Sequence, residues 1–318
     1  MRRNIIICAV LAASMILLPV FMLKDKKAVS TMKNEDFEYE EQGKISVMKS
    51  INGKVLTVDE REYLIGALAA EMDLSYHEEA LKAQVVACYT YSVYVRENIS
   101  SDDLNGAQIS DDPQVHQGYI TQEERKKKWG EKFDEYEKKA EKAVEAVYGK
   151  AIYYGGKPIL AVYHDLNSGK TESSETVWKR KEPYLVQVES PGDRLSSKYS
   201  SKTELSYDDF EKLISKIDGV ELSDNKDNWI GKVVKTESGY VKSVEICGDA
   251  ISSEDFRSAL GLKSCCFSIS EEDDLIIIRT LGNGHMVGMS QYGADYMARQ
   301  GADYIEILKF YYSDVEIR

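Results

Sequence analysis

One glutamate in this sequence has the surroundings expected of an acid catalyst. Glu71 follows the run Leu68-Ala69-Ala70, in the last turn of a predicted helix. A carboxyl group near a helix C-terminus meets the negative end of the helix dipole, and apolar neighbours partly desolvate it, so both effects raise its pKa. A general acid that works near neutral pH needs such a pKa. The same residues also fit an exposed helix-end glutamate without a catalytic role.

Two predicted helices meet beside Glu71. Thr57 and Glu60 have the spacing of a capping box before the first helix, and Ser75 and Glu78 repeat that spacing before the second. The chain is therefore expected to turn between the helices, with Glu71 at the corner.

The second helix has two distinct faces. Positions alternately four and three residues apart are apolar or small, which is typical of a face packed against a core. Positions seven residues apart stay polar, and they share one strip because a straight helix drifts by only about 20° per heptad. The predicted buried positions are Leu81, Val85, Cys88, Ser92 and Val95, and the polar strip is Lys82, Tyr89 and Arg96.

A polar loop has the composition of a sugar-binding segment. The segment AIYYGGKPILAVYH predicts a hairpin that turns at Gly155-Gly156, and the loop His164–Trp178 after it is dense in hydrogen-bonding side chains. Polar groups can meet sugar hydroxyls, and an indole can meet the face of a pyranose ring. An ordinary polar turn with a buried Trp178 fits these residues equally well.

A glycine-rich turn is the next informative stretch. Four glycines in LGNGHMVGMSQYGA lie around the join of a predicted strand, Ile276–Leu281, and a predicted helix, Gln291–Arg299, which Ser290 would cap. Such glycines let a backbone approach a ligand closely. The pattern is neither a Walker loop nor GxGxxG in a βαβ unit. His285 could orient or assist an acid, although a lone histidine is more often structural.

The remaining segments mix helical and strand patterns, which predicts an α+β fold. Residues 97–123 cluster Ser, Asp, Asn, Gly and Pro and predict a long loop. On the charged helical segment 124–148, the run Arg125–Lys128 predicts a solvated face, with a polyanion contact as the alternative. Other predicted elements are a strand within Ile51–Val58, a strand in YLVQVESP, helices at Tyr207–Ile217 and from Ser253, and a strand pair within Ile230–Ile246.

The first 27 residues predict a membrane anchor. Ile5–Leu23 contains no charged residue, and 19 residues at about 1.5 Å each span roughly 28 Å, close to one hydrocarbon thickness. No small-x-small cleavage site precedes the following lysines, so a retained anchor is favoured over a cleaved signal. We expect a single-pass protein of the cell membrane with an extracytoplasmic C-terminal domain. The expected limits are 1–27 for the anchor, 28–54 for a linker and 55–318 for the domain.

Charge and cysteine content exclude some classes of function. Beyond residue 27 the chain carries 36 basic and 53 acidic residues, because five of its 41 bases and one of its 54 acids precede that point. This net charge of −17 argues against nucleic acid as a partner. Among Cys8, Cys88, Cys247, Cys265 and Cys266 no CxxC spacing occurs, and the sequence has no paired-histidine spacing, so neither a disulfide framework nor a zinc site is expected. No cofactor is expected either.

Three segments together resemble the stage II sporulation protein D/LytB-domain family. They are GALAAEM…EEALKAQVVA, YHDLNSGKTESSETVW…EPYLVQVESP and GNGHMVGMSQYGADYMARQGADYIEILKFYYSDVEI. The resemblance spans about residues 55–318, and the last motif is highly specific. It implies a family-specific two-lobed α+β fold with a substrate cleft. It also implies a lytic transglycosylase that cuts MurNAc–GlcNAc bonds in peptide-stripped glycan strands during engulfment.

The resemblance also implies partners and site residues. The partners would be peptidoglycan glycan strands, an amidase (stage II sporulation protein P) and a membrane anchor protein of the engulfment complex. Glu71 matches the family's catalytic glutamate, which acts alone on the glycosidic bond, unlike the paired carboxylates of most glycosidases. The matching substrate-binding positions are Lys82, His164, Ser168, Gly169, His285, Gln291 and Tyr292.

Two departures from the family pattern leave a second hypothesis open. Many members carry Arg where this chain has Tyr89, and Arg96, one heptad later, is the candidate replacement. Some members also hold a zinc cluster, but residues 97–163 contain His116 and no cysteine, so no such site is expected. The competing hypothesis is a glycan-binding modifier that activates a cell-wall amidase without cutting glycan. The intact Glu71 favours the enzyme, and the missing Arg slightly favours the modifier.

Overall fold

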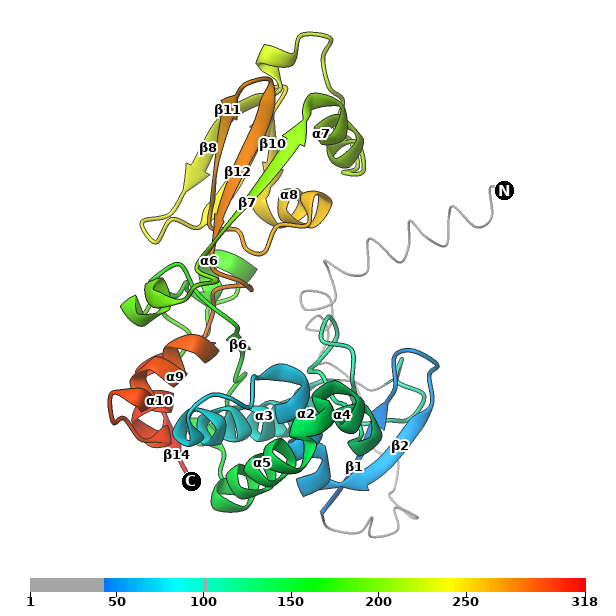
Figure 1. The fold of residues 1–318 in the computed structure, drawn as a ribbon, viewed down its shortest axis with the longest axis vertical. Coiled ribbons are helices and arrows are strands. Elements are labelled where there is room, and N and C mark those ends of the chain that lie inside the picture. Colours follow the sequence, from blue (N-terminus) through cyan, green and yellow to red (C-terminus); the bar gives the residue numbers. More distant parts are fainter. Residues whose placement is uncertain (1–42, 100–101) are drawn as a thin grey trace, which may run out of the picture. The chain divides into compact units, whose positions relative to one another are not determined.

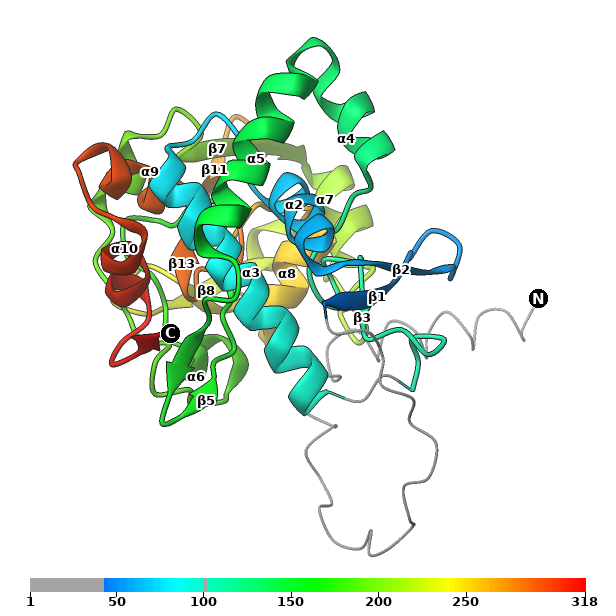
Figure 2. The ribbon, with the colours of Figure 1, turned by 90° about the horizontal axis from the view of Figure 1, so that it is seen from below.

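The computed structural model describes residues 43–99 and 102–318 (Figures 1 and 2). These residues divide into two compact units. Of these residues, unit 1 contains 43–74 and 88–149, and unit 2 contains 75–87 and 150–318. Both units mix helices with small sheets, so the predicted α+β class is confirmed. The two-lobed arrangement with a cleft stays a prediction.

The predicted membrane anchor, residues 1–27, and the first part of the predicted linker lie outside the described residues. Among the helices of the described segments, none has both the length and the apolar character needed to cross a bilayer.

Unit 1 contains a three-stranded sheet of order β2-β1-β3, with β1 antiparallel to β2 and parallel to β3. Ile45 and Val47 alternate with less buried neighbours and supply its buried face. The predicted linker, 28–54, therefore contains a strand, which its polar composition concealed. The strands are β1 (Lys44–Met48), β2 (Val55–Asp59) and β3 (Ile109–Ser110).

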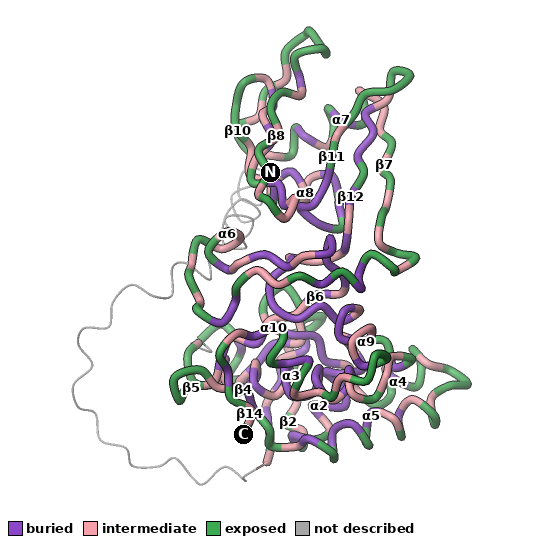
Figure 3. The backbone as a smooth tube through the Cα atoms, turned by 90° about the vertical axis from the view of Figure 1, so that its left-hand side faces the viewer, coloured by how far each residue is buried: buried purple, intermediate pink, exposed green. Residues whose placement is uncertain are grey.

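Helix α2 (Glu60–Glu71) is the central helix of unit 1, packed against both α5 and β1 (Figure 2). Most of its residues are buried, whereas α4 and α5 have many exposed residues (Figure 3). Asp59 caps α2 by accepting a 2.8 Å hydrogen bond from the Arg61 N–H. The predicted cap at Thr57 was wrong because Thr57 belongs to strand β2.

Helix α3 (Glu78–Asn98) begins in unit 2 and ends in unit 1. At its start the Glu79 N–H donates to His77 Nδ1 at 3.3 Å. All five apolar-face positions predicted for this helix are buried and the polar strip is half-buried, so its two faces are confirmed.

Two further helices complete unit 1. A capping box between Thr121 and Glu124 starts α4, and a 3-10 turn joins it to α5. The long loop predicted for residues 97–123 contains β3, and hydrogen bonds described below fix its end on α2. The bounds are α4 (Gln122–Trp129), η1 (Gly130–Lys132) and α5 (Phe133–Val147).

Unit 2 contains two antiparallel three-stranded sheets, of order β10-β9-β8 and β11-β12-β7, which share one apolar core with α7 and α8 (Figure 1). Phe210, Phe256 and Ile276 are fully buried there. The strand pair and both helices predicted for this region are confirmed. The bounds are β7 (Ser200–Ser206), α7 (Tyr207–Ile214), η3 (Lys226–Asn228), β8 (Ile230–Lys235), β9 (Val241–Ile246), β10 (Asp249–Ser252), α8 (Ser253–Leu260), β11 (Phe267–Glu272) and β12 (Leu275–Leu281).

The rest of unit 2 is built from short elements. The predicted hairpin at Gly155-Gly156 is confirmed as β4 and β5, and Ser290 caps α9 through the Gly293 N–H as predicted. The bounds are β4 (Ile152–Tyr154), β5 (Lys157–Pro158), β6 (Tyr163–His164), α6 (Ser174–Trp178), η2 (Pro191–Leu195), β13 (Met289–Ser290), α9 (Gln291–Arg299), α10 (Tyr304–Tyr311) and β14 (Glu316–Ile317).

The strand predicted in YLVQVESP does not form. Its backbone makes one isolated bridge, between Lys170 and Glu189. The Val188 N–H donates to the Thr171 hydroxyl at 2.8 Å instead of to a carbonyl. A side chain thus takes a bond that would extend the ladder, which ends regular pairing.

Candidate active site

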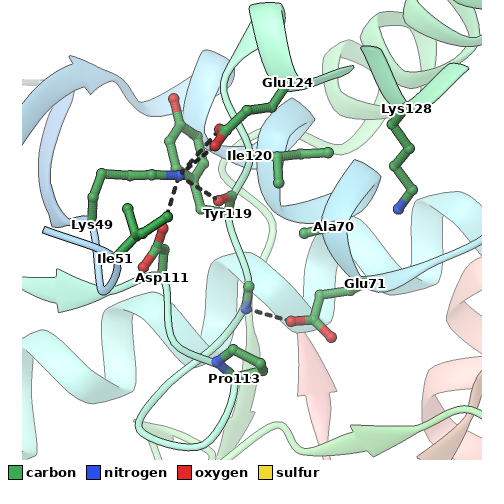
Figure 4. A pocket seen from close by; sticks show the side chains of 11 residues that line it. Lys49, Ile51, Ala70, Glu71, Asp111, Pro113, Tyr119, Ile120, Glu124 and Lys128 are labelled. Carbon is green, nitrogen blue, oxygen red and sulfur yellow. Dashed lines mark hydrogen bonds and ion pairs between the residues drawn. The ribbon is translucent and has the colours of Figure 1, made fainter. Parts of the chain in front are cut away.

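Glu71, the last residue of α2, lines a pocket of about 430 Å³ in unit 1 (Figure 4). Its carboxylate Oε1 accepts a short hydrogen bond from the backbone N–H of Gly118. Apolar residues, among them Ala70, Pro113 and Ile120, line part of the pocket, and charged residues line the rest. A carboxyl group thus faces a space of the size that binds small ligands.

The surroundings of Glu71 raise its pKa above the usual value. Burial is the largest cause, because it penalises the charged form. The Gly118 N–H and the positive charge of Lys128 act in the opposite direction, and the net shift remains upward. The carboxyl group therefore holds a proton at a higher pH than a solvated glutamate, and its conjugate base has a donor in place.

The contact with Gly118 depends on two glycines. At Gly66 on α2, a Cβ atom would lie 2.4 Å from the Tyr119 ring and 2.5 Å from the Ile120 carbonyl oxygen. At Gly118, a Cβ atom would lie 2.8 Å from Glu71 Oε1. The segment Gly118–Ile120 therefore lies directly against α2. There the Ile120 N–H also donates to the Gly66 carbonyl at 3.3 Å.

Arg125 fixes the position of the segment that contains Gly118 and Ile120. Its guanidinium donates to both oxygens of Glu62, at 2.9 and 3.1 Å, and to both oxygens of Glu137, at 2.8 and 2.7 Å. It also donates to the Ile120 carbonyl at 3.1 Å. Arg125 is fully buried, so the solvated face predicted for Arg125–Lys128 was wrong at its first residue. The two carboxylates offset the desolvation penalty of burying the guanidinium group.

Two lysines of the pocket lie in different environments. Lys49 is paired with Asp111 at 2.8 Å and with Glu124 at 3.1 Å (Figure 4). Lys128 donates to the Ala69 carbonyl at 2.7 Å, in the last turn of α2. No carboxylate of the described segments lies within ion-pair distance of the Lys128 ammonium group.

Tyr89 and Arg96 belong to unit 1, like Glu71. The Tyr89 ring packs on Tyr148 at 6.3 Å between centroids. Arg96 pairs with Glu60 at 3.0 Å, at the other end of α2. Glu60 and Glu71 are 11 positions apart, or about 16 Å along the helix axis. Arg96 therefore does not supply a cation beside Glu71, and the cation that does lie there, Lys128, was not among the predicted site residues.

The other seven predicted site residues belong to unit 2. Lys82 pairs with Glu79 at 2.5 Å. The Gln291 side chain donates to Gln84 at 3.3 Å, and the Tyr292 ring meets Tyr76 edge-on at 6.4 Å. Their role in substrate binding stays a prediction.

Two of the histidines of unit 2, His164 and His285, lie together. The His164 and His285 rings are 5.6 Å apart between centroids, and Trp178 lies 5.3 Å from His285. Burial lowers the pKa of His164 to about 3 and that of His285 to about 4, so both rings are neutral at pH 7. His164 Nδ1 faces the Val287 carbonyl at 3.1 Å and carries the proton, which leaves a lone pair on Nε2. In the described part of the chain, this buried Nε2 has no hydrogen-bond partner.

The segment that carries Ser168 and Gly169 is fixed by a buried carboxylate, Asp193. The Asn167 N–H and side-chain amide donate to Asp193 at 2.9 and 3.1 Å. The hydroxyls of Ser190 and Ser290 donate to it as well. Asp193 therefore joins the polar loop to the start of α9, and burial raises its pKa. Nothing in the sequence pattern marked this residue.

Residues 43–99 and 102–318 contain no group of three or more histidine, cysteine, aspartate or glutamate side chains that could hold a metal ion. The arrangement around Glu71 is thus a partly buried carboxyl group, one peptide N–H and one ammonium group beside a pocket. Such a set can donate a proton and then stabilise the resulting carboxylate.

Comparison with known proteins identifies the family. The family model for SpoIID, described as Stage II sporulation protein, matches residues 49–154. Stage II sporulation protein D of Bacillus subtilis (strain 168) is 33% identical, covering 100% of this chain and 96% of its own length. The protein of that name from Bacillus amyloliquefaciens is 35% identical, covering 86% of this chain and 78% of its own. The Amidase enhancer of Bacillus subtilis (strain 168) is 28% identical, over 78% of this chain and 39% of its own.

These names support a role in sporulation, and the resemblance seen in the sequence motifs is confirmed. The chain belongs to the stage II sporulation protein D family.

Proposed function

We propose that this protein is a lytic transglycosylase of sporulation, anchored in the cell membrane with its C-terminal domain outside the cytoplasm. It would cleave MurNAc–GlcNAc bonds in peptide-stripped glycan strands and leave 1,6-anhydroMurNAc ends during engulfment. The observation that carries this proposal is the partly buried Glu71, whose pKa is raised and whose carboxylate accepts the Gly118 N–H at the edge of a pocket.

The reaction needs one carboxyl group used twice. Protonated Glu71 donates its proton to O4 of the departing GlcNAc as the C1–O4 bond breaks. The carboxylate formed is stabilised by the Gly118 N–H and the Lys128 charge. It then accepts the proton of the MurNAc C6 hydroxyl while O6 bonds to C1. No water is consumed, and Glu71 ends in the protonated form in which it began.

The decisive experiment is product analysis. The full-length protein in detergent is incubated with peptide-free glycan strands, and the products are analysed by mass spectrometry. We expect new 1,6-anhydroMurNAc ends, which carry one water fewer than hydrolysed ends, and their disappearance in Glu71→Gln. Binding of strands without new ends in the wild type would refute the proposal.

The name of one relative, Amidase enhancer, favours a second candidate, a glycan-binding modifier that activates a cell-wall amidase. The proposed partner in both cases is the amidase stage II sporulation protein P, together with a membrane anchor protein of the engulfment complex. A modifier would increase amidase turnover equally in wild type and Glu71→Gln, whereas the enzyme would lose its own products in the variant.

A further inference from the structure

Within the described residues, the pocket beside Glu71 contains one lysine that is ion-paired with two carboxylates and one, Lys128, that attracts Asp73 and Glu71 without forming an ion pair. Lys49 is held between Asp111 and Glu124. Lys128 lines the same pocket, and its only recorded hydrogen bond within the described residues is to the Ala69 carbonyl. An ammonium group has three donors, so the geometry leaves two of them for a ligand.

We propose that the Lys128 ammonium binds the lactyl carboxylate of a muramic acid residue whose stem peptide has been removed, and thereby selects peptide-free strands. This inference rests on the proposed function. It assigns the recognition of the missing peptide to one side chain, which no sequence motif of the chain indicated.

The chemistry of the substrate makes this carboxylate the distinguishing group. In a peptide-bearing strand the lactyl carbon is part of an amide, which has no charge. In a stripped strand it is a carboxylate, attached through an ether to C3 of the sugar whose C1–O4 bond is cut. An ammonium group next to the acid can therefore tell the two strands apart. A charge-assisted hydrogen bond of this kind changes affinity by about 10- to 100-fold.

A simpler role for Lys128 is to stabilise the end of α2, because lysines often contact the last carbonyls of a helix. That role would not distinguish charged from uncharged strands. The two roles therefore differ in substrate preference and not in overall activity alone.

The test compares two matched substrates. Peptide-free strands are used either unmodified or with their lactyl carboxylates converted to methylamides, which removes the charge and adds little bulk. The full-length protein should show a 10- to 100-fold higher kcat/KM on unmodified strands. Lys128→Met should bring that ratio near 1, and Lys128→Arg should keep a preference for unmodified strands. Lys127→Met, an exposed neighbour on the same helix, is the matched control and should keep the wild-type ratio.

Two outcomes would overturn the inference. Lys128→Met could keep the wild-type ratio, or it could lose activity equally on both substrates while the wild type shows no preference. Strand binding in a Glu71→Gln background, measured with labelled strands of both kinds, tests the inference without catalysis. A wild type that forms no anhydro ends refutes the proposed function, while the ratio of the two dissociation constants still decides the role of Lys128.

Discussion

Replacing Glu71 by glutamine should abolish activity without destabilising the protein. The amide keeps an oxygen that can accept the Gly118 N–H, so the local geometry has no reason to change. It cannot donate and accept the catalytic proton, and loss of general acid–base catalysis lowers rates by about 10²- to 10⁴-fold. The assay is the rate at which 1,6-anhydroMurNAc ends form on peptide-free strands.

The raised pKa of Glu71 determines the sign of the effect of Glu71→Gln on the free energy of unfolding. Because the pKa of Glu71 is raised in the folded protein, the folded state binds its proton more tightly than the unfolded state. This contribution to stability is complete below the unfolded pKa and is lost as pH rises through the folded pKa. Each pKa unit of the shift corresponds to about 1.4 kcal/mol. Glu71→Gln should therefore gain stability relative to wild type as pH rises from about 4.5 towards neutrality.

Chemical denaturation at several pH values measures this difference, with the fluorescence of Trp129 reporting on unit 1 in variants that lack the other two tryptophans. Tyr63 and Tyr91 interact with Glu71 but do not titrate in this pH range. Burial is the largest cause that raises both of their pKa values above 10. A variant that is less stable than wild type by the same amount at every pH would show that Glu71 is a structural residue. Retained activity would refute its catalytic role.

Three further substitutions test the supports of the site. Gly118→Ala would place a Cβ atom 2.8 Å from the carboxyl oxygen that the Gly118 N–H contacts, so we expect about 1–3 kcal/mol lower stability and a 10- to 100-fold slower reaction, measured by denaturation and product analysis. Arg125→Met leaves Glu62 and Glu137 without their shared cation and should cost about 3–5 kcal/mol in denaturant unfolding. Asp193→Ala removes the acceptor of four buried donors and should lower the free energy of unfolding by more than about 3 kcal/mol, measured as a lower denaturation midpoint. An unchanged midpoint would contradict the role of Asp193 in joining the polar loop to the start of α9.

The elements that were predicted correctly are those whose sequence signals lie within a few residues of one another. Ser290 caps α9, and both ends of that helix agree with the prediction, because the cap and the apolar spacing lie within a few residues of each other. The faces of α3 were also predictable from heptad spacing. Strand β1 was missed because its partners, β2 and β3, supply the pairing that makes a polar segment fold.

The immediate surroundings of Glu71 could not be predicted, because they come from distant segments. The Gly118 donor is a backbone N–H, 47 residues away, and a backbone group leaves no residue type to recognise. Arg125 and Lys128 form part of one basic run, yet one is buried and the other lines the pocket. Sequence spacing gives the face of a helix, whereas burial of a charge depends on whether distant carboxylates meet it.

The distribution of cations explains how Glu71 can hold a proton in a chain rich in charge. A guanidinium paired directly with a carboxylate lowers its pKa by one to three units. Three arginines of unit 1 are paired with other carboxylates, since Arg61 pairs with Glu145, Arg96 pairs with Glu60, and Arg125 bridges Glu62 and Glu137. Lys128, held on a carbonyl, lowers the pKa of Glu71 less than burial raises it. The same ammonium group can therefore attract a substrate carboxylate without removing the proton on which the proposed reaction depends.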